Sequence, residues 1–186
     1  MKTLLHACCA PCSIMVIQGL RESGVEPVAY WFNPNIHPFT EYRERRDTLA
    51  RYTASIEMEM MVNEAYGLRE FVRAVHPNLE DRCGVCYRIR LEETARKAAE
   101  LGFDSFTSTL FVSPYQRHEL MRETAEKMAV KYGVEFLYRD FRPVFREGQQ
   151  KARELELYMQ KYCGCVFSEE ERYARQLVPW AGEGSR

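Results

Sequence analysis

The segment LLHACCAPCS, residues 4–13, decides the fold class. Its apolar start at residues 4–7 predicts a buried strand, and the apolar residues after the cysteine-rich turn recur at helical spacing. A strand, a loop and a helix are therefore expected in succession. In open parallel sheets, ligands bind beyond the carboxyl ends of the strands. Cys8, Cys9 and Cys12 thus lie where a functional site is expected.

The same alternation of strand and helix continues along the chain. Further strands are expected at residues 27–32, 56–60, 103–112 and 134–138, and helices at residues 41–52, 91–101 and 116–132. This pattern predicts an α/β fold with a parallel-sheet core, helices on both faces and a helical C-terminal region. The 186 residues are expected to form a single domain, residues 1–186, with a frayed tail at residues 181–186.

Composition and charge exclude several classes of protein. The chain is 46% hydrophobic and 28% charged, which disfavours a disordered chain, a collagen-like repeat and a coiled-coil rod. His6 and Pro11 interrupt the N-terminal apolar run, and no later run approaches the roughly 18 residues of a membrane span. We therefore expect a soluble cytoplasmic protein without a membrane partner. The formal net charge of −1 means that any nucleic acid must bind to a local basic patch.

Seven cysteines are the unusual feature of the composition. They fall into three tight groups, which are Cys8, Cys9 and Cys12, then Cys83 and Cys86, and finally Cys163 and Cys165. An odd, clustered set in a chain of this size is not typical of the disulfide framework of a small secreted domain. Reduced thiols are therefore expected.

The first two groups supply five thiols, one more than the four thiolates of an iron-sulfur cluster. Structural zinc would use the same atoms, but small zinc modules place their cysteine pairs roughly 15 to 20 residues apart. About seventy residues separate Cys12 from Cys83 here. The spacing favours an iron-sulfur cluster over zinc, and two unrelated groups of buried cysteines are the alternative. Asp81 and Arg82 flank the second group and are candidates for supporting contacts.

The third group, Cys163-Gly164-Cys165, suggests redox chemistry of a different kind. A glycine between two cysteines permits the bend of a short, strained disulfide, and strained disulfides are reduced more readily. Closure of the dithiol releases two electrons, so the pair is a candidate two-electron reservoir. Two free thiols near a helix end are the alternative.

Arginine and aromatic residues are interleaved in the second half of the chain. Arginine makes up 20 of the 26 basic residues, and its planar fork suits phosphate. Arginine beside exposed aromatic rings can hold the phosphates of RNA while a base stacks on the ring. The candidate RNA contacts are Tyr115, Arg117, Arg139, Arg142 and Arg146. For each of them, a salt bridge or a buried ring edge is the alternative. Of the histidines, His6 is expected in the core and His118 on a solvated helix surface.

Three cysteine motifs in this order are distinctive. They are HACCAPC at residues 6–12, the pair Cys83 and Cys86, and YMQKYCGCVFS at residues 158–168. With these motifs the chain resembles the QueH family of epoxyqueuosine reductases. The stretches SPY at residues 113–115 and RDFRPVFREG at residues 139–148 are also similar to that family, so the resemblance covers almost the whole chain.

The resemblance implies a fold similar to the adenine nucleotide alpha hydrolases. It also implies reduction of epoxyqueuosine, an epoxide on the wobble base of a tRNA, to queuosine with a [4Fe-4S] cluster. Matched by position, the cluster ligands would be Cys8, Cys9, Cys83 and Cys86. Cys163 and Cys165 would form a redox-active pair, which an external electron donor, a reductant or a thiol system, must recharge.

Cys12 is left over in this assignment, although spacing alone does not settle which of the first three cysteines is the non-ligand. Its place near a helix start predicts a lowered thiol pKa. We therefore expect Cys12 to bind an additional iron ion or to lie beside the substrate.

Two other functions compete with this interpretation. An iron-sulfur tRNA sulfurtransferase of similar fold needs ATP, but this chain has CCAPCS at residues 8–13 where such enzymes have an SGGxDS loop. The chain also lacks the GxxxxGK[ST] and GxGxxG motifs that bind nucleotides. A zinc-stabilised adaptor that binds RNA is the second alternative, and it would contain zinc without iron.

Overall fold

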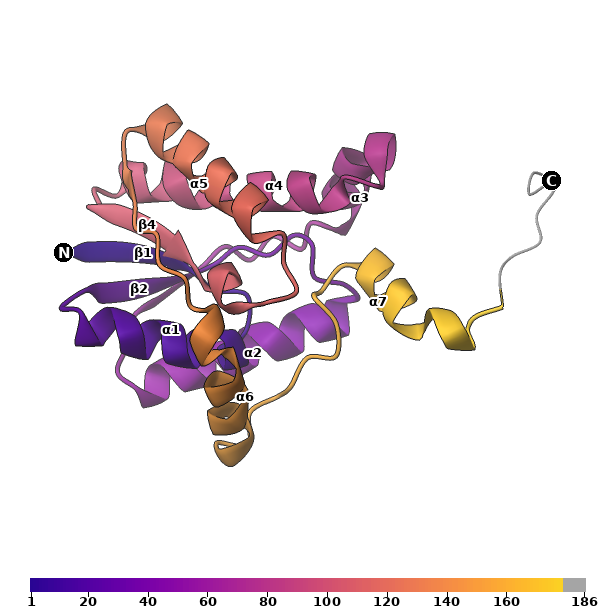
Figure 1. Cartoon of the computed structure of the whole chain (residues 1–186), viewed down its shortest axis with the longest axis horizontal. Coiled ribbons are helices and arrows are strands. Elements are labelled where there is room, and N and C mark those ends of the chain that lie inside the picture. The colour runs from indigo at the N-terminus through magenta and orange to yellow at the C-terminus, as the bar shows by residue number, and fades with distance from the viewer. Residues whose placement is uncertain (179–186) are drawn as a thin grey trace.

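A five-stranded parallel sheet forms the centre of the structure, a computed structural model that describes residues 1–178 (Figure 1). Its strands are β1 (Lys2–His6), β2 (Glu26–Trp31), β3 (Met60–Val62), β4 (Ser105–Ser108) and β5 (Glu135–Phe136). The α-helices are α1 (Ala10–Glu22), α2 (Phe39–Ser55), α3 (Leu68–Val75), α4 (Arg82–Glu100), α5 (His118–Tyr132), α6 (Phe145–Glu154) and α7 (Val166–Tyr173). The short 3-10 helices are η1 (His76–Asn78), η2 (Thr109–Val112), η3 (Arg142–Val144) and η4 (Ala174–Gln176).

The strand order is β3-β2-β1-β4-β5, and every neighbouring pair is parallel. In Figure 1, α4 and α5 cover one face of the sheet, and α1, α2 and α6 lie on the other. The expected α/β fold with a parallel, doubly covered sheet is confirmed. Because the chain winds outward in both directions from β1 and β4, the carboxyl ends of these two strands form the switch point where ligands bind in such sheets.

The centre of the sheet is apolar on both faces, as a doubly covered parallel sheet requires. Leu4 and Leu5 of β1 are fully buried. His6 is also fully buried, as expected, and its ring nitrogens bond the hydroxyl of Ser108 at 2.9 Å and the carbonyl of Phe32 at 3.1 Å. Burial lowers the pKa of His6 to about 4, so the ring is neutral at pH 7 and has a structural role.

The strand expected at residues 56–60 is wrong in position, because β3 begins only at Met60. Helix α2 continues to Ser55, and Glu57 then takes a left-handed conformation with φ of 52°. The amide of Met58 bonds back to the carbonyl of Thr53, which closes a turn. This turn buries Met58. The alternation of apolar and charged residues at positions 56–60 therefore does not reflect a strand.

Two helix predictions also need correction. Helix α4 begins at Arg82, not at residue 91, and therefore carries Cys83 and Cys86 in its first turns. His118, expected on a solvated surface, is only 6% exposed, because it packs against Phe111 and its Nε2 lies 3.1 Å from the hydroxyl of Tyr138. The tail expected at residues 181–186 lies outside the described residues.

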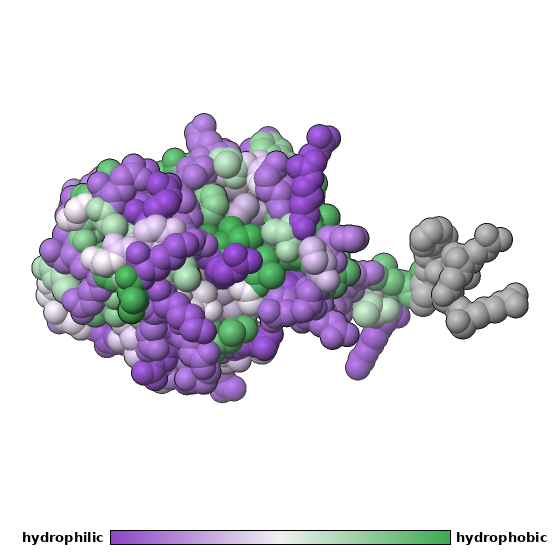
Figure 2. Space-filling model, turned by 90° about the horizontal axis from the view of Figure 1, so that it is seen from above, coloured by the Kyte–Doolittle hydropathy of each residue, from purple (hydrophilic) through white to green (hydrophobic). Residues whose placement is uncertain are grey.

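Most of the surface seen from above is hydrophilic, with small apolar areas between polar side chains (Figure 2). Within residues 1–178, no helix combines the length and the apolar character needed to cross a membrane. Helix α7 lies beyond the carboxyl ends of the strands, at the opposite end of the sheet from the N-terminus (Figure 1).

Candidate active site

The first cysteine group lies at the switch point between β1 and β4. The amide of Cys8 donates to the Oγ1 of Thr109 at 3.2 Å, and the same hydroxyl donates to the Sγ of Cys8 at 3.5 Å. Thr109 directly follows β4, so this pair joins the ends of the two central strands. The chain then enters α1 through Pro11, whose missing amide hydrogen is not needed in the first turn of a helix.

The sulfur atoms of Cys8, Cys9 and Cys12 all lie within 4.8 Å of one another, and all three residues are buried. We call them the thiol trio. The side-chain amide of Gln160 donates to the sulfurs of Cys9 at 3.0 Å and Cys12 at 3.5 Å. Three thiols are a soft donor set of the kind that suits zinc or iron-sulfur centres. The trio therefore fits three of the four thiolate positions of an iron-sulfur cluster, or a single metal ion.

The three thiols differ in acidity because they are hydrogen-bonded to one another. Hydrogen bonding with Cys12 and with Cys9 lowers the pKa of Cys8 well below the ordinary value. Burial raises the pKa of Cys9, and the hydrogen bond to Cys8 raises that of Cys12. The expectation that the helix start lowers the pKa of Cys12 is therefore wrong, since the neighbouring thiol outweighs the helix dipole. Cys8 is therefore the most acidic thiol of the trio.

The second cysteine group lies apart from the trio. Among residues 1–178, neither Cys83 nor Cys86 belongs to a set of three or more metal-binding side chains as close as the trio. Cys86 is buried in a small apolar cluster with Cys165, Phe71 and Val75. Burial raises the pKa of Cys86 to about 11.

The third group is held in place by a buried arginine of α2. Arg45 is 2% exposed and pairs with Glu41, 2.6 Å away. The two terminal nitrogens of Arg45 donate to the main-chain carbonyls of Tyr162 at 3.0 Å and Cys163 at 3.1 Å. Arg45 thereby fixes the path of residues 162–165, which we call the CxC loop.

A glycine allows the CxC loop to approach the chain after β2. Gly164 has φ of +134°, and its carbonyl accepts a hydrogen bond from the amide of His37 at 2.8 Å. A Cβ atom at this position would lie 2.9 Å from the Cγ1 of Ile36, closer than real Cβ contacts come. Only glycine combines this backbone angle with this approach.

Cys163 and Cys165 are a coupled pair of unequal thiols. The thiol of Cys165 donates to Cys163 and lowers the pKa of Cys163 to about 5, and Ser168, 2.9 Å from Cys163, adds to the effect. The same coupling raises the pKa of Cys165. One exposed thiolate beside one buried thiol is the arrangement from which a disulfide forms or exchanges.

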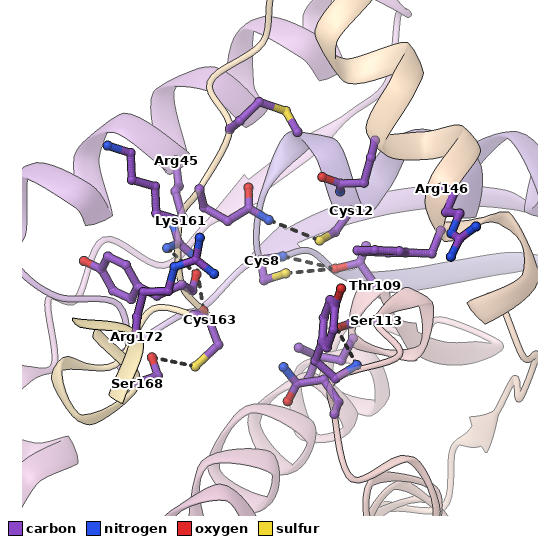
Figure 3. A pocket seen from close by; sticks show the side chains of 18 of the residues that line it. Cys8, Cys12, Arg45, Thr109, Ser113, Arg146, Lys161, Cys163, Ser168 and Arg172 are labelled. Atoms are coloured by element: carbon purple, nitrogen blue, oxygen red, sulfur yellow. Dashed lines mark hydrogen bonds between the residues drawn. The ribbon is translucent and has the colours of Figure 1, made fainter. Parts of the chain in front are cut away.

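A pocket of about 1110 Å³ connects the first and third cysteine groups. Cys8, Cys12 and Cys163 line it, and Figure 3 shows Cys163 facing the same space as Cys8 and Cys12. Pockets for small molecules typically measure about 300 to 1,000 Å³, so this pocket lies slightly above the upper end of that range. Four exposed cations also line the pocket, and none pairs with a carboxylate among residues 1–178; they are Arg146, Arg153, Lys161 and Arg172.

The structure brings only part of the expected RNA contacts to this pocket. Arg146 lines it, and so does Tyr115, which is 84% exposed and packs edge-on against Phe145. Arg117, in contrast, does not line the pocket. Its guanidinium pairs with the carboxylate of Asp81 at 2.9 Å.

Two further arginines from that set lie elsewhere. Arg139 donates to the carbonyl of Gly19 at 2.7 Å, about 14 Å along α1 from its start beside the site. Arg142 makes a bidentate pair with Asp140, with contacts of 2.9 and 2.7 Å. Neither side chain lines the pocket.

Comparison with known families identifies the chain. The family model described as epoxyqueuosine reductase QueH matches residues 3–171, which include all seven cysteines. The chain belongs to the QueH family. It is therefore an enzyme of the oxidoreductase class, as the resemblance implied.

Curated QueH proteins are similar along most of this chain. The epoxyqueuosine reductase QueH of Dehalococcoides mccartyi is 38% identical over 178 residues, which cover 96% of this chain and 98% of that protein. The protein of the same name from Thermotoga maritima is 33% identical and covers 91% of each chain. That from Streptococcus pyogenes serotype M1 is 34% identical, covering 89% of this chain and 69% of its own length.

A solved structure supports the fold of this QueH-family chain. The crystal structure of a predicted subunit of tRNA methyltransferase from Methanocaldococcus jannaschii matches with a TM-score of 0.53. It covers 84% of this chain and 89% of that one at 12% identity, so the likeness concerns the fold alone.

Several residues of this QueH site were not predicted from the sequence. Gln160 and Lys161 could have been predicted, because they belong to the motif YMQKYCGCVFS that contains the CxC loop. No motif or spacing in the sequence marks Thr109, Arg45 and Arg90 as site residues. They lie near the cysteines only because the fold brings distant segments together. Arg82, a candidate from its position beside Cys83, pairs with Glu171 and so ties α4 to α7.

Proposed function

We propose that this chain reduces epoxyqueuosine in tRNA to queuosine. The observation that carries the proposal is a pocket lined by Cys8 and Cys12 of the thiol trio and by Cys163 of the CxC loop, in a chain of the QueH family. Conversion of an epoxide to an alkene breaks two C–O bonds, forms a C=C bond and releases the oxygen as water. The reaction consumes two electrons and two protons.

The CxC loop can supply the two electrons. Oxidation of the Cys163 thiolate and the Cys165 thiol to a disulfide releases two electrons and one proton, and the solvent supplies the second proton that the reduction of one epoxide consumes. The low pKa of Cys163 favours the thiolate that starts such chemistry. An external thiol or other reductant must then reopen the disulfide before the next turnover.

A [4Fe-4S] cluster is the proposed link between the CxC loop and the substrate. We propose that Cys8 and Cys9 of the trio hold it with Cys83 and Cys86 of α4, which leaves Cys12 for an additional iron ion beside the pocket. When bound, the cluster would transfer electrons and polarise the epoxide oxygen. Gln160 would donate hydrogen bonds to the sulfur ligands and help to position them.

An assay on defined tRNA tests the proposed function. The protein is reconstituted anaerobically with ferrous iron and sulfide, and its iron and sulfide contents are measured. It is then incubated with tRNA that carries epoxyqueuosine and with a thiol reductant, and the nucleosides are analysed by mass spectrometry. Loss of one oxygen atom from the modified nucleoside is expected. A fully loaded protein that leaves the epoxide intact would overturn the proposal.

The pocket rim predicts how the tRNA is held. Tyr115→Ala removes a ring on which a base can stack and is expected to weaken tRNA binding about tenfold. Arg146→Ala is expected to lower the slope of log affinity against log salt by about 1, the effect of one lost phosphate contact. Filter binding over a salt series measures both. Arg122→Ala, an exposed cation outside the pocket lining, is the matched control and should bind like the wild type. Wild-type affinity for both rim variants would exclude this surface.

A further inference from the structure

Arg90 is a buried cation without an acidic partner. It is 4% exposed and lies one helical turn after Cys86 on α4. Its Nε donates to the carbonyl of Cys86 at 3.3 Å, and it forms no salt bridge with any carboxylate among residues 1–178. Burial of a charge without a counter-charge is costly, so such a side chain normally faces an anion.

Arg45 differs from Arg90 in having a carboxylate partner. Both arginines are buried and both line the pocket. Arg45, however, is neutralised by Glu41 at 2.6 Å, and its remaining donors reach two carbonyls of the CxC loop. The charge and the donors of Arg45 are therefore accounted for within the protein, whereas the charge of Arg90 is not.

Arg90 is placed beside residues of all three cysteine groups. It lines the pocket together with Cys8 and Cys163, and its Nε donates to the carbonyl of Cys86. These cysteines raise the pKa of Arg90 against the effect of burial. The effect is mutual, since Arg90 lowers the pKa of Cys163 after stronger contributions from Cys165 and Ser168. Arg90 therefore stands among groups that are about seventy or more residues apart in the sequence.

We propose that Arg90 is the counter-ion of the cysteine centre, a positioning residue whose positive charge balances the negative charge that Cys8, Cys86 and Cys163 gather in the loaded enzyme. The inference rests on the proposed function, because it requires a centre that collects thiolates and accepts electrons. Each added electron increases the negative charge beside the guanidinium. Arg90 therefore favours the reduced state of the centre.

Reduction potentials of the reconstituted protein test this role without an activity measurement. Arg90→Met keeps the length of the side chain but removes its charge, and Arg90→Lys keeps the charge. Arg88→Met is the matched control, because Arg88 is exposed on the same helix two residues away. We expect a more negative potential in Arg90→Met, which corresponds to an equilibrium constant for reduction that is lower by about tenfold. Arg90→Lys should recover most of the loss, and Arg88→Met should match the wild type.

Unfolding by urea distinguishes a counter-ion from an ordinary structural residue. Arg90→Met should lower the stability of the loaded protein more than that of the metal-free protein, because the charge to be balanced is greatest in the loaded form. Equal destabilisation of both forms, or a metal-free variant that does not fold, would overturn the proposal. So would an unchanged potential combined with weaker tRNA binding, which would assign Arg90 to the substrate.

The outcomes also separate this inference from the proposed function. If the wild-type protein takes up no iron and sulfide, the proposed function and the role of Arg90 are both overturned. If the wild type is loaded and active, and Arg90→Met has the same potential and the same stability difference, only the role of Arg90 is overturned.

Discussion

Replacement of Cys163 and Cys165 by serine is expected to lower the multiple-turnover rate with a thiol reductant by about two orders of magnitude. The physical reason is electron supply, because serine hydroxyls cannot form the disulfide that releases two electrons. Uptake of iron and sulfide should remain, since neither residue is among the proposed cluster ligands. The rate of queuosine formation is measured under excess substrate, beside the iron content of each variant. Normal turnover in the double variant would show that the CxC loop is not the reservoir.

Alkylation of Cys163 gives a second measurement on the same loop. Since the hydrogen bond from Cys165 lowers the pKa of Cys163 to about 5, its reaction with iodoacetamide should rise through that pH and be constant near pH 7. Cys165, whose pKa is raised, should react far more slowly and serves as the internal control. In Cys165→Ala the midpoint for Cys163 should move upward. A midpoint near 9 in the wild type would contradict the coupling.

Replacement of Cys8 by serine is expected to remove the iron-sulfur centre and with it all epoxide reduction. Cys8 has the lowered thiol pKa of the trio and lies at the switch point, where it contacts Thr109. Loss of a supporting contact typically costs about 10 to 100-fold in metal affinity, and loss of a ligand should cost more. Iron and sulfide contents and the visible spectrum after anaerobic reconstitution measure the effect.

Cys12→Ser is the matched comparison for Cys8→Ser, because both residues belong to the trio and are equally buried at 8% exposure. We expect Cys12→Ser to keep the cluster and to lose only the additional iron. If Cys12→Ser loses the cluster while Cys8→Ser retains it, the assignment of ligand and non-ligand is reversed. Circular dichroism of the metal-free proteins checks that both variants keep the sheet.

The sequence allowed the fold class and the cysteine groups to be predicted, because both depend on local patterns. Apolar residues 4–7 followed by a cysteine turn and a helix place the trio at the end of β1, as found. The start of α4 was missed because Gly84 and Val85 weaken the helical signal around Cys83, whereas packing of α4 against its neighbours keeps the helix there. The apolar alternation at residues 56–60 also led to the prediction of a strand where the chain forms a turn at Met58.

The electrostatic part of the site could not be predicted in this way. Arg45 and the CxC loop are 118 residues apart, and Arg90 and Cys8 come from different elements of the sheet and its helices. An arginine in a helix is most often exposed, so nothing in the local pattern distinguishes these two from Arg88. Their roles follow from burial and from the identity of the groups that surround them.

The contact between Arg45 and the CxC loop also decides which changes the loop tolerates over evolutionary time. Arg45 binds main-chain carbonyls, which every amino acid possesses, so a new side chain at position 163 leaves this anchor intact. Gly164 has no such freedom, because its backbone angle and the proximity of Ile36 exclude a Cβ atom. One glycine and one distant arginine thus determine the backbone conformation of the loop. The side chains that carry its chemistry can change while that conformation is kept.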